Sequence, residues 1–316
     1  MQNYNFIQKL LHDIVLSNKF INKSLFEIEK LIKLKKNNID KNSHIFITGL
    51  PRSGTTILLN FIFSSDEFAS LKYSNMPFIF SPNFSKLFNK KNILKKERLH
   101  ADGIYYDLNS PEALDEIFFS QNESYIKDEL INYLQIILIS QNKSRYLSKN
   151  NLNYKRINLI SSILPNSIFL IPVREPFQHA YSLLNQHLHF TKLQKKDDFI
   201  RRYMNYLGHN EFGLNHKAWN KPIKFDDPNS IDYWLEQWTL FYKKIQKDYE
   251  SQTNCVFIIY ENLSNSSFIE QLIKNLNLYK KEKLNLSFFK NSNKQKIDIH
   301  FDSYVYENAV NIYKSF

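Results

Sequence analysis

One glycine-bounded segment carries the residue types best suited to bind an anion. It reads Gly-Leu-Pro-Arg-Ser-Gly-Thr-Thr over residues 49–56, after an apolar strand predicted at His44–Thr48 and at the start of a helix predicted over Thr55–Phe63. A strand, loop and helix in this order direct backbone N–H groups and the positive end of the helix dipole at a bound anion. Arg52 adds a forked cation and three hydroxyls add donors. The candidate ligands are Pro51, Arg52, Ser53, Gly54, Thr55 and Thr56. The alternative is an ordinary strand-to-helix turn with an exposed arginine.

The glycine spacing of this segment is that of a P-loop, but Thr55 stands where a nucleotidase needs lysine. The Lys-Ser/Thr pair that grips β- and γ-phosphates and Mg²⁺ is therefore missing, which argues against a triphosphatase. A P-loop nucleotide kinase remains the nearest alternative enzyme.

A second candidate anion site follows an apolar strand predicted at Ser167–Val173. Arg174 directly follows this strand, and Ser182 lies eight residues later in a helix predicted to start at Pro176. Ligands of open parallel sheets collect at the carboxyl ends of the strands, so Arg174 is well placed to bind one. The alternative is a salt bridge at the helix start for Arg174 and a capping or surface role for Ser182.

Two further predicted strands end in polar side chains. Lys149 follows a short strand at Tyr146–Ser148, and Tyr260 ends a strand at Val256–Tyr260. A solvated lysine is the alternative for Lys149 in a chain this rich in lysine, and Tyr260 is equally suited to packing.

These four motifs, in this order, resemble those of the sulfotransferase family that uses 3′-phosphoadenosine 5′-phosphosulfate (PAPS), and the loop is nearest to the tyrosylprotein sulfotransferase branch. The resemblance implies that Arg52 and its loop bind the 5′-phosphosulfate, and that Lys149 faces the bridging and sulfuryl oxygens. It also implies that Arg174 and Ser182 bind the 3′-phosphate, and that Tyr260 lies near the nucleotide. PAPS would be the co-substrate, with PAP as product and no metal.

The resemblance spans residues 45 to about 278, although it does not closely cover residues 74–146, and its motifs show two departures. Glu175 stands where the family has aspartate, and Asn150-Asn151 replaces the Thr/Asp-Pro that follows the family's lysine.

An acceptor hydroxyl also needs a general base, and here the sequence departs from the tyrosylprotein branch. That branch has a glutamate soon after the second strand, but residues 70–75 carry no carboxylate. His100 is the first substitute, because a neutral imidazole is a suitable base near pH 7 and Asp102 could orient it. Glu112 and Glu116, one helical turn apart, are the other candidates. A surface role is the alternative for a lone loop histidine.

Strands alternate with helices along the chain, which predicts an α/β fold with a central parallel sheet and helices on both faces. The resemblance implies a three-layer, P-loop-like fold of the sulfotransferase type. A further strand is predicted at Phe68–Tyr73. The remaining predicted helices are one or two over Phe6–Leu34, one opening at Ser110-Pro111, and others at Ile126–Ser140, Tyr154–Leu164, Pro176–His189, Phe199–Leu207, Ile231–Tyr249, Ser266–Leu276 and Ser303–Tyr313.

We expect a single sulfotransferase domain over residues 1–316, with an N-terminal helical extension at 1–40 and a catalytic core at 45–278. Insertions at 74–146 and 192–228, rich in Tyr, Phe, His and Asn, are expected to form the acceptor side. Such surfaces suit a polar or carbohydrate-like acceptor; a small metabolite or a peptide remains open.

Composition narrows the class of protein. A 43% hydrophobic and 15% aromatic content excludes a disordered chain. The single cysteine, Cys255, excludes an intramolecular disulfide and a thiolate metal cage, and no His, Asp or Glu cluster has the spacing of metal ligands. No apolar run approaches the roughly 18 residues that span a bilayer, and the first residues lack a signal-peptide pattern. We therefore expect a soluble cytoplasmic protein.

The net charge of +11 also permits a non-catalytic polyanion-binding protein that uses the basic run Lys90–Arg98. Against it, that run lacks interleaved aromatic residues for base stacking, and the anion-binding candidates lie at strand ends. We expect no nucleic-acid partner.

Overall fold

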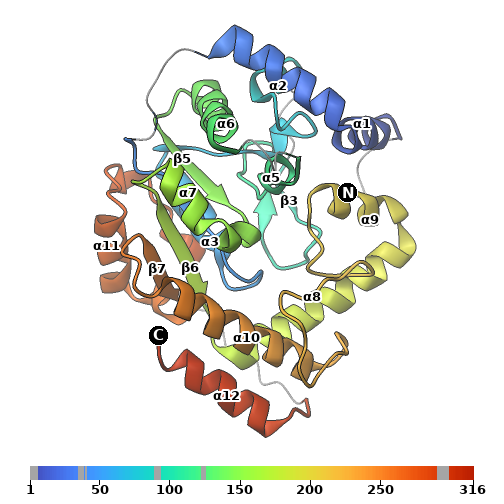
Figure 1. Cartoon of the computed structure of the whole chain (residues 1–316), viewed down its shortest axis with the longest axis vertical. Helices are drawn as coiled ribbons and strands as arrows, with labels where there is room; N and C mark the ends of the chain where they lie inside the picture. Colours follow the sequence, from blue (N-terminus) through green and yellow to red (C-terminus); the bar gives the residue numbers. More distant parts are fainter. Residues whose placement is uncertain (1–5, 35–38, 40, 89–93, 122–125, 290–298) are drawn as a thin grey trace.

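The computed structural model describes residues 6–34, 39, 41–88, 94–121, 126–289 and 299–316 (Figure 1). Its centre is a five-stranded sheet in the order β2-β5-β1-β6-β7, and every neighbouring pair of strands is parallel. The strands are β1 (Ile45–Ile47), β2 (Phe68–Ala69), β5 (Arg145–Lys149), β6 (Ile168–Val173) and β7 (Cys255–Ile259). The predicted parallel sheet is therefore confirmed. A separate antiparallel hairpin pairs β3 (Lys96–Glu97) with β4 (Tyr105–Tyr106).

Helices cover both faces of the sheet. Successive side chains of a strand point to opposite faces, so each strand contributes apolar side chains to a buried cluster on either side. Ile45 and Ile47 of β1 belong to one buried cluster, together with apolar residues of α3 (Thr55–Ser64) and α11 (Ser266–Asn275). Phe46 belongs to the cluster on the other face. That cluster includes residues of α6 (Ile126–Gln141), α7 (Ile157–Ile163) and α10 (Ile231–Tyr249). The protein is thus a three-layer α/β fold, as expected.

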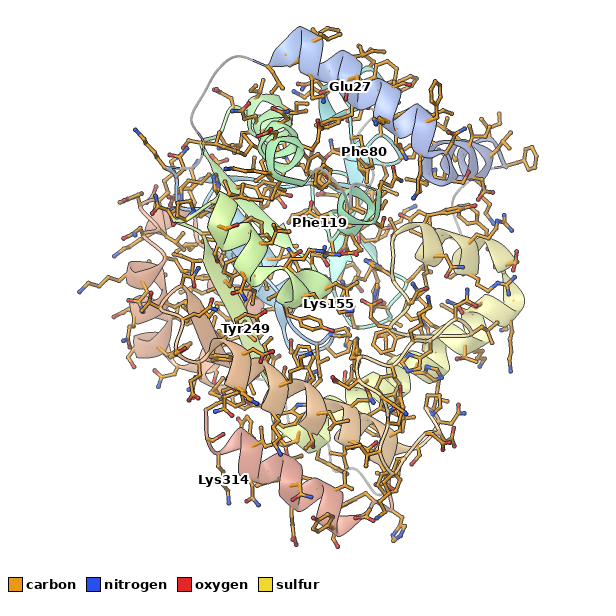
Figure 2. The ribbon with its side chains drawn as sticks, viewed as in Figure 1. Glu27, Phe80, Phe119, Lys155, Tyr249 and Lys314 are labelled. Atoms are coloured by element: carbon orange, nitrogen blue, oxygen red, sulfur yellow. The ribbon has the colours of Figure 1, made fainter. Side chains whose placement is uncertain are left out.

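The other helices surround this core. They are α1 (Phe6–Ser17), α2 (Lys19–Lys33), α4 (Pro82–Ser85), α5 (Glu116–Gln121), α8 (Pro176–Lys196), α9 (Asp198–Tyr206) and α12 (Ser303–Tyr313). The described residues also form short 3₁₀ helices: η1 (Tyr73–Asn75), η2 (Lys86–Phe88), η3 (Asn151–Lys155), η4 (Tyr260–Ser264), η5 (Lys281–Lys283) and η6 (Leu286–Phe289). In Figure 2 the labelled Phe80 and Phe119 lie in the interior and Lys314 at the rim. No helix in the described ranges is long and apolar enough to cross a membrane.

Local capping explains where two of these helices begin. Asn18 separates α1 from α2, and its side-chain oxygen accepts from Phe20 N at 3.0 Å and Ile21 N at 3.2 Å. Glu175 caps α8 by accepting from Gln178 N at 2.7 Å, and Pro176 occupies the first turn. α8 runs to Lys196, seven residues beyond the predicted end.

The prediction of a helix that begins at Ser110-Pro111 is wrong. Glu112 N donates to Leu71 O at 3.0 Å and Tyr73 N donates to Ser110 O at 3.2 Å, so backbone pairing with the segment after β2 holds this stretch extended. The helix, α5, begins only at Glu116. These tertiary hydrogen bonds outweigh the local proline and acid signal.

Smaller differences concern element limits. The predicted strand at Phe68–Tyr73 is only two residues long, and the predicted helix at Tyr154–Leu164 begins as 3₁₀ helix η3 before α7. The first four residues of the basic run Lys90–Arg98 lie outside the described residues; its last part contains β3.

Candidate active site

A cavity of about 650 Å³ lies at the carboxyl ends of the parallel strands. Four of its lining residues follow or end four different strands: Arg52 in the loop after β1, Lys149 at the end of β5, Arg174 after β6 and Tyr260 after β7. Parallel strands end at one edge of a sheet, so residues distant in the sequence meet there. The structure thus brings together the residues of all four motifs.

The loop between β1 and α3 has an unusual backbone. Arg52 has φ 68° and Gly54 has φ 101°, a region that residues other than glycine rarely adopt. A Cβ atom on Gly54 would lie 2.5 Å from Tyr260 Cδ2, so the tyrosine ring packs directly against the loop. The Ser53 hydroxyl is buried and donates to Leu50 O at 2.7 Å, inside the loop. The loop residues that line the cavity include Pro51, Arg52, Gly54, Thr55 and Thr56.

His179 on α8 supports this loop from the side of the core. Its Nε2 lies 2.8 Å from Pro51 O, and its Nδ1 lies 3.1 Å from the Trp238 indole Nε1. A carbonyl only accepts and an indole N–H only donates, so the imidazole is neutral with its proton on Nε2. Burial lowers the pKa of His179 to about 3. The loop is therefore held by a group that does not titrate near neutral pH.

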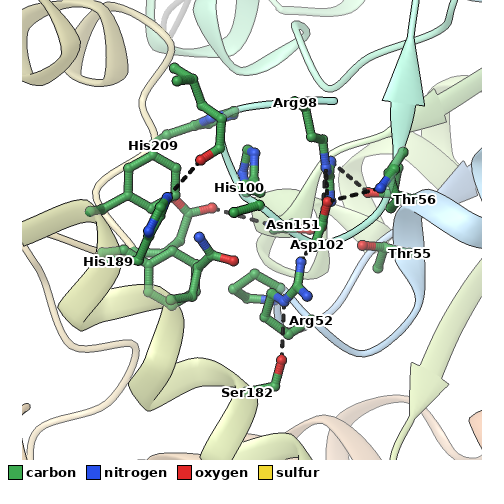
Figure 3. A pocket seen from close by; sticks show the side chains of 18 of the residues that line it. Arg52, Thr55, Thr56, Arg98, His100, Asp102, Asn151, Ser182, His189 and His209 are labelled. Atoms are coloured by element: carbon green, nitrogen blue, oxygen red, sulfur yellow. Dashed lines mark hydrogen bonds and ion pairs between the residues drawn. The ribbon is translucent and has the colours of Figure 1, made fainter. Parts of the chain in front are cut away.

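Two arginines share one carboxylate above the loop (Figure 3). Asp102 accepts from Arg52 Nη1, and from Arg98 Nε at 3.0 Å and Nη2 at 2.5 Å. Arg98 Nη1 also donates to Thr56 Oγ1 at 3.3 Å, and Arg52 Nε donates to Ser182 Oγ at 3.1 Å. Burial opposes ionisation of Asp102, but the arginines outweigh it and hold its pKa below the ordinary value. Arg98 thus adds a guanidinium that the sequence did not predict.

A second buried network surrounds Glu112. Lys149 Nζ lies 3.8 Å from Glu112 Oε1, Arg98 Nη1 lies 3.9 Å from Oε2, and the Tyr73 hydroxyl donates to the carboxylate. Burial raises the pKa of Glu112, but Lys149 and Arg98 outweigh it and bring the pKa to about 2. Burial also lowers the pKa of Lys149, against the attraction of Glu112. Glu112 is therefore ionised at neutral pH beside a partly desolvated lysine.

The three candidate bases have different surroundings. His100 lines the cavity with its ring 5.1 Å from Phe190, and burial holds its pKa well below the ordinary value. Asp102 is engaged by arginines, and His100 Nδ1 has no hydrogen-bond partner among the described residues. Glu116 accepts from Arg156 at 2.6 and 2.7 Å and is not among the cavity-lining residues. Of the three candidate bases, His100 and Glu112 therefore line the cavity and Glu116 does not.

The two residues predicted for the 3′-phosphate both contact Arg52. Arg174 Nη1 donates to Arg52 O at 3.2 Å, and its guanidinium carbon lies 5.3 Å from the centre of the Tyr260 ring. Ser182 accepts from Arg52 Nε. Arg174 and Ser182 both line the cavity.

One face of α8 supplies cavity residues that sequence reasoning missed. They recur at helical spacing around Ser182 and are Gln178, Tyr181, Asn185, Gln186, His189 and Phe190. The spacing from Ser182 could have identified them. No comparable signal marks Glu211, which lies in a loop and accepts from Asn151 Nδ2 at 3.1 Å. In the described part of the chain, no group of three or more His, Cys, Asp or Glu residues could hold a metal ion.

The parallel sheet, the loop after β1 and the basic residues at the strand ends define an α/β protein of the P-loop-like kind, with a candidate anion-binding cavity. The model of the sulfotransferase family matches residues 44–216, more than half of the chain. The chain therefore belongs to the sulfotransferase family.

Two solved structures support the fold. They are the sulfotransferases STF9 from Mycobacterium avium and STF1 from Mycobacterium tuberculosis H37Rv, each with a TM-score of 0.52 and 10% sequence identity. Both alignments cover 95% of this chain, and they cover 83% and 84% of the respective structures. At this identity the likeness concerns the fold alone. A comparison with curated proteins found no significant match, and none of the comparisons supports the tyrosylprotein branch.

Proposed function

We propose that the protein transfers the sulfuryl group of PAPS to a hydroxyl or amine of an acceptor. The observation that carries this proposal is the convergence of Arg52, Lys149 and Arg174 from three strand ends on one cavity. A donor with several negative charges needs preorganised cations and backbone donors around it, and this cavity offers both.

We assign the residues that would hold PAPS by their resemblance to the family's motifs, and all of them line the cavity. Arg52, the loop amides and the Thr55 and Thr56 hydroxyls are assigned to the 5′-phosphosulfate, and Arg174 with Ser182 to the 3′-phosphate. The fit rests on the chemistry of the cavity lining, because the side chains of Arg52 and Arg174 supply cations and those of Thr55 and Thr56 supply hydroxyl donors. When bound, PAPS supplies the activated sulfuryl group.

In the proposed reaction an acceptor oxygen forms a bond to sulfur while the bond from sulfur to the phosphate oxygen breaks and PAP leaves. Lys149 neutralises charge on the leaving oxygen, which only builds up in the transition state. His100 is the proposed base, because its imidazole is neutral and its Nδ1, which has no hydrogen-bond partner in the described part of the chain, can take the hydroxyl proton. Glu112 is the next candidate, and Glu116 is less suited because Arg156 already engages both its oxygens.

We also propose the division of the chain that this reaction implies. Residues 1–316 would form one sulfotransferase domain, with the catalytic core at 45–278 and an N-terminal helical extension at 1–40. The segments 74–146 and 192–228 would build the acceptor side; both contribute to the cavity lining.

Isothermal calorimetry with PAP, ATP and an oligonucleotide tests the proposal. We expect PAP to bind at one site without Mg²⁺, and more tightly than ATP with or without Mg²⁺. Tighter binding of ATP with Mg²⁺ would favour a nucleotide kinase, and tight binding of the oligonucleotide alone would favour a polyanion-binding protein. Either result would overturn the proposed function.

A further inference from the structure

We infer that the acceptor is a small molecule whose reacting hydroxyl is attached to an apolar body, and that this body occupies the end of the cavity formed by α9. This inference rests on the proposed sulfuryl transfer and specifies its second substrate. It departs from the polar or carbohydrate-like acceptor that the composition of the loops suggested.

One face of α9 gives that end of the cavity its apolar character. Ile200, Tyr203, Met204 and Leu207 recur at helical spacing and all line the cavity. Each is no more than 7% exposed, and Phe212 from the following segment joins them in the same core cluster. A sugar ring in this place would bury hydroxyls against hydrocarbon without hydrogen-bond partners, which is unfavourable. An aromatic or aliphatic body would instead gain from leaving water.

Some of the polar side chains that line the cavity also have atoms without a hydrogen-bond partner. Among the described residues, three buried polar atoms of cavity-lining side chains have no hydrogen-bond partner: Gln186 Nε2, His100 Nδ1 and Asn151 Oδ1. Gln186 is only 4% exposed. A buried polar group without a partner destabilises the protein, so its presence beside a cavity points to a ligand that completes it.

The size of the cavity favours a small acceptor. A volume of about 650 Å³ falls within the roughly 300–1,000 Å³ usual for one drug-sized ligand. Here the same space must also hold the nucleotide. An oligosaccharide or a polypeptide segment would need further room and partners for its many polar groups.

A pair of matched variants tests the role of Gln186. Gln186→Leu removes the amide, whose Nε2 has no partner among the described residues, and puts an apolar side chain in its place. Thr191→Val is the control, because Thr191 Oγ1 on the same helix is also buried without a partner among the described residues, yet Thr191 does not line the cavity. We expect neither change to lower the Tm or weaken PAP binding. Only Gln186→Leu should weaken acceptor binding, by about tenfold for one lost hydrogen bond.

The acceptor probes are 2-naphthol and 1-octanol, titrated by calorimetry into the protein saturated with PAP. N-acetylglucosamine and a tyrosine-containing acidic peptide are the comparison ligands. We expect at least one apolar alcohol to bind more tightly than both comparison ligands, with the tenfold loss in Gln186→Leu and none in Thr191→Val.

Tighter binding of the sugar or the peptide, or equal affinity of the apolar alcohol for all three proteins, would overturn the inference. If PAP itself fails to bind, the proposed function fails separately. The same alcohols are then titrated into the protein without nucleotide, where absence of binding overturns the inference as well.

Discussion

The network around Glu112 makes stability depend on pH in a way that can be measured without either substrate. The carboxylate is buried, accepts from Ala113 N at 2.7 Å and lies 3.8 Å from Lys149 Nζ. Its pKa falls from an ordinary 4.5 to about 2, since Lys149 and Arg98 outweigh the effect of burial. A carboxylate whose pKa is lower in the folded than in the unfolded protein stabilises the native state at pH values above the unfolded pKa. This stabilisation is lost as the pH falls toward the folded pKa. The lowered pKa corresponds to a stabilisation of the native state by roughly 3 kcal/mol when the carboxylate is ionised.

The perturbation is Glu112→Gln, which keeps the shape of the side chain and removes its titration. We expect the difference in unfolding free energy between wild type and variant to stay constant from about pH 6 to pH 8. Below pH 5 it should shrink, with about 2 kcal/mol lost by pH 3. Urea denaturation followed by tryptophan fluorescence at a series of pH values measures this difference.

Asp115→Asn is the control, because we expect its effect on the unfolding free energy to depend on pH in the opposite direction. Burial raises the pKa of Asp115 to about 6, so the wild type loses stability as the pH rises from about 4 to 6 and the variant does not. If the free-energy difference for Glu112→Gln is flat between pH 6 and pH 3, the ion pairs with Lys149 and Arg98 do not hold the carboxylate and the reasoning is refuted.

Three further predictions concern the nucleotide and the base. Arg174→Ala should weaken PAP about tenfold to 10²-fold and leave adenosine 5′-phosphosulfate almost unchanged, because one charged hydrogen bond is lost; equal losses in calorimetry would remove Arg174 from the 3′-phosphate. Gly54→Ala should weaken PAP at least about tenfold, since a left-handed backbone costs about 1–2 kcal/mol and Tyr260 must move; unchanged affinity would contradict the packing argument. His100→Ala should lower kcat and abolish the fall of the rate at acid pH. In the wild type we expect this fall at a pH below 6.5, the ordinary pKa of histidine, because burial lowers the pKa of His100. A fall that survives in this variant transfers the role of base to Glu112.

The positions of Arg52, Lys149 and Arg174 could be predicted because each lies at the end of a strand or in the segment that follows one. Short apolar runs fix the strands, and parallel pairing then brings their carboxyl ends to one edge of the sheet. The local pattern therefore carried information about tertiary position.

The rest of the cavity depends on contacts that the local pattern does not encode. The segment at Pro111 reads as a helix start but is held extended by Leu71 and Tyr73, and this places Glu112 beside Lys149. Arg98 donates to Thr56, which lies 42 residues earlier in the chain, and no local pattern indicates this contact. The composition of segment 192–228 shows that it is rich in polar residues. It does not show which face of α9 lines the cavity.

The most direct test of sulfuryl transfer is to follow a radioactive sulfur atom in PAPS. The protein is incubated with labelled PAPS and an extract of the cells that make it, and the labelled products are separated. We predict that the label moves to a small organic product as PAP forms in equal amount, and that Lys149→Ala lowers this rate at least about 10²-fold with PAP affinity nearly intact. Label that stays in PAPS, or appears only as free sulfate at a rate that Lys149→Ala does not change, would contradict the account.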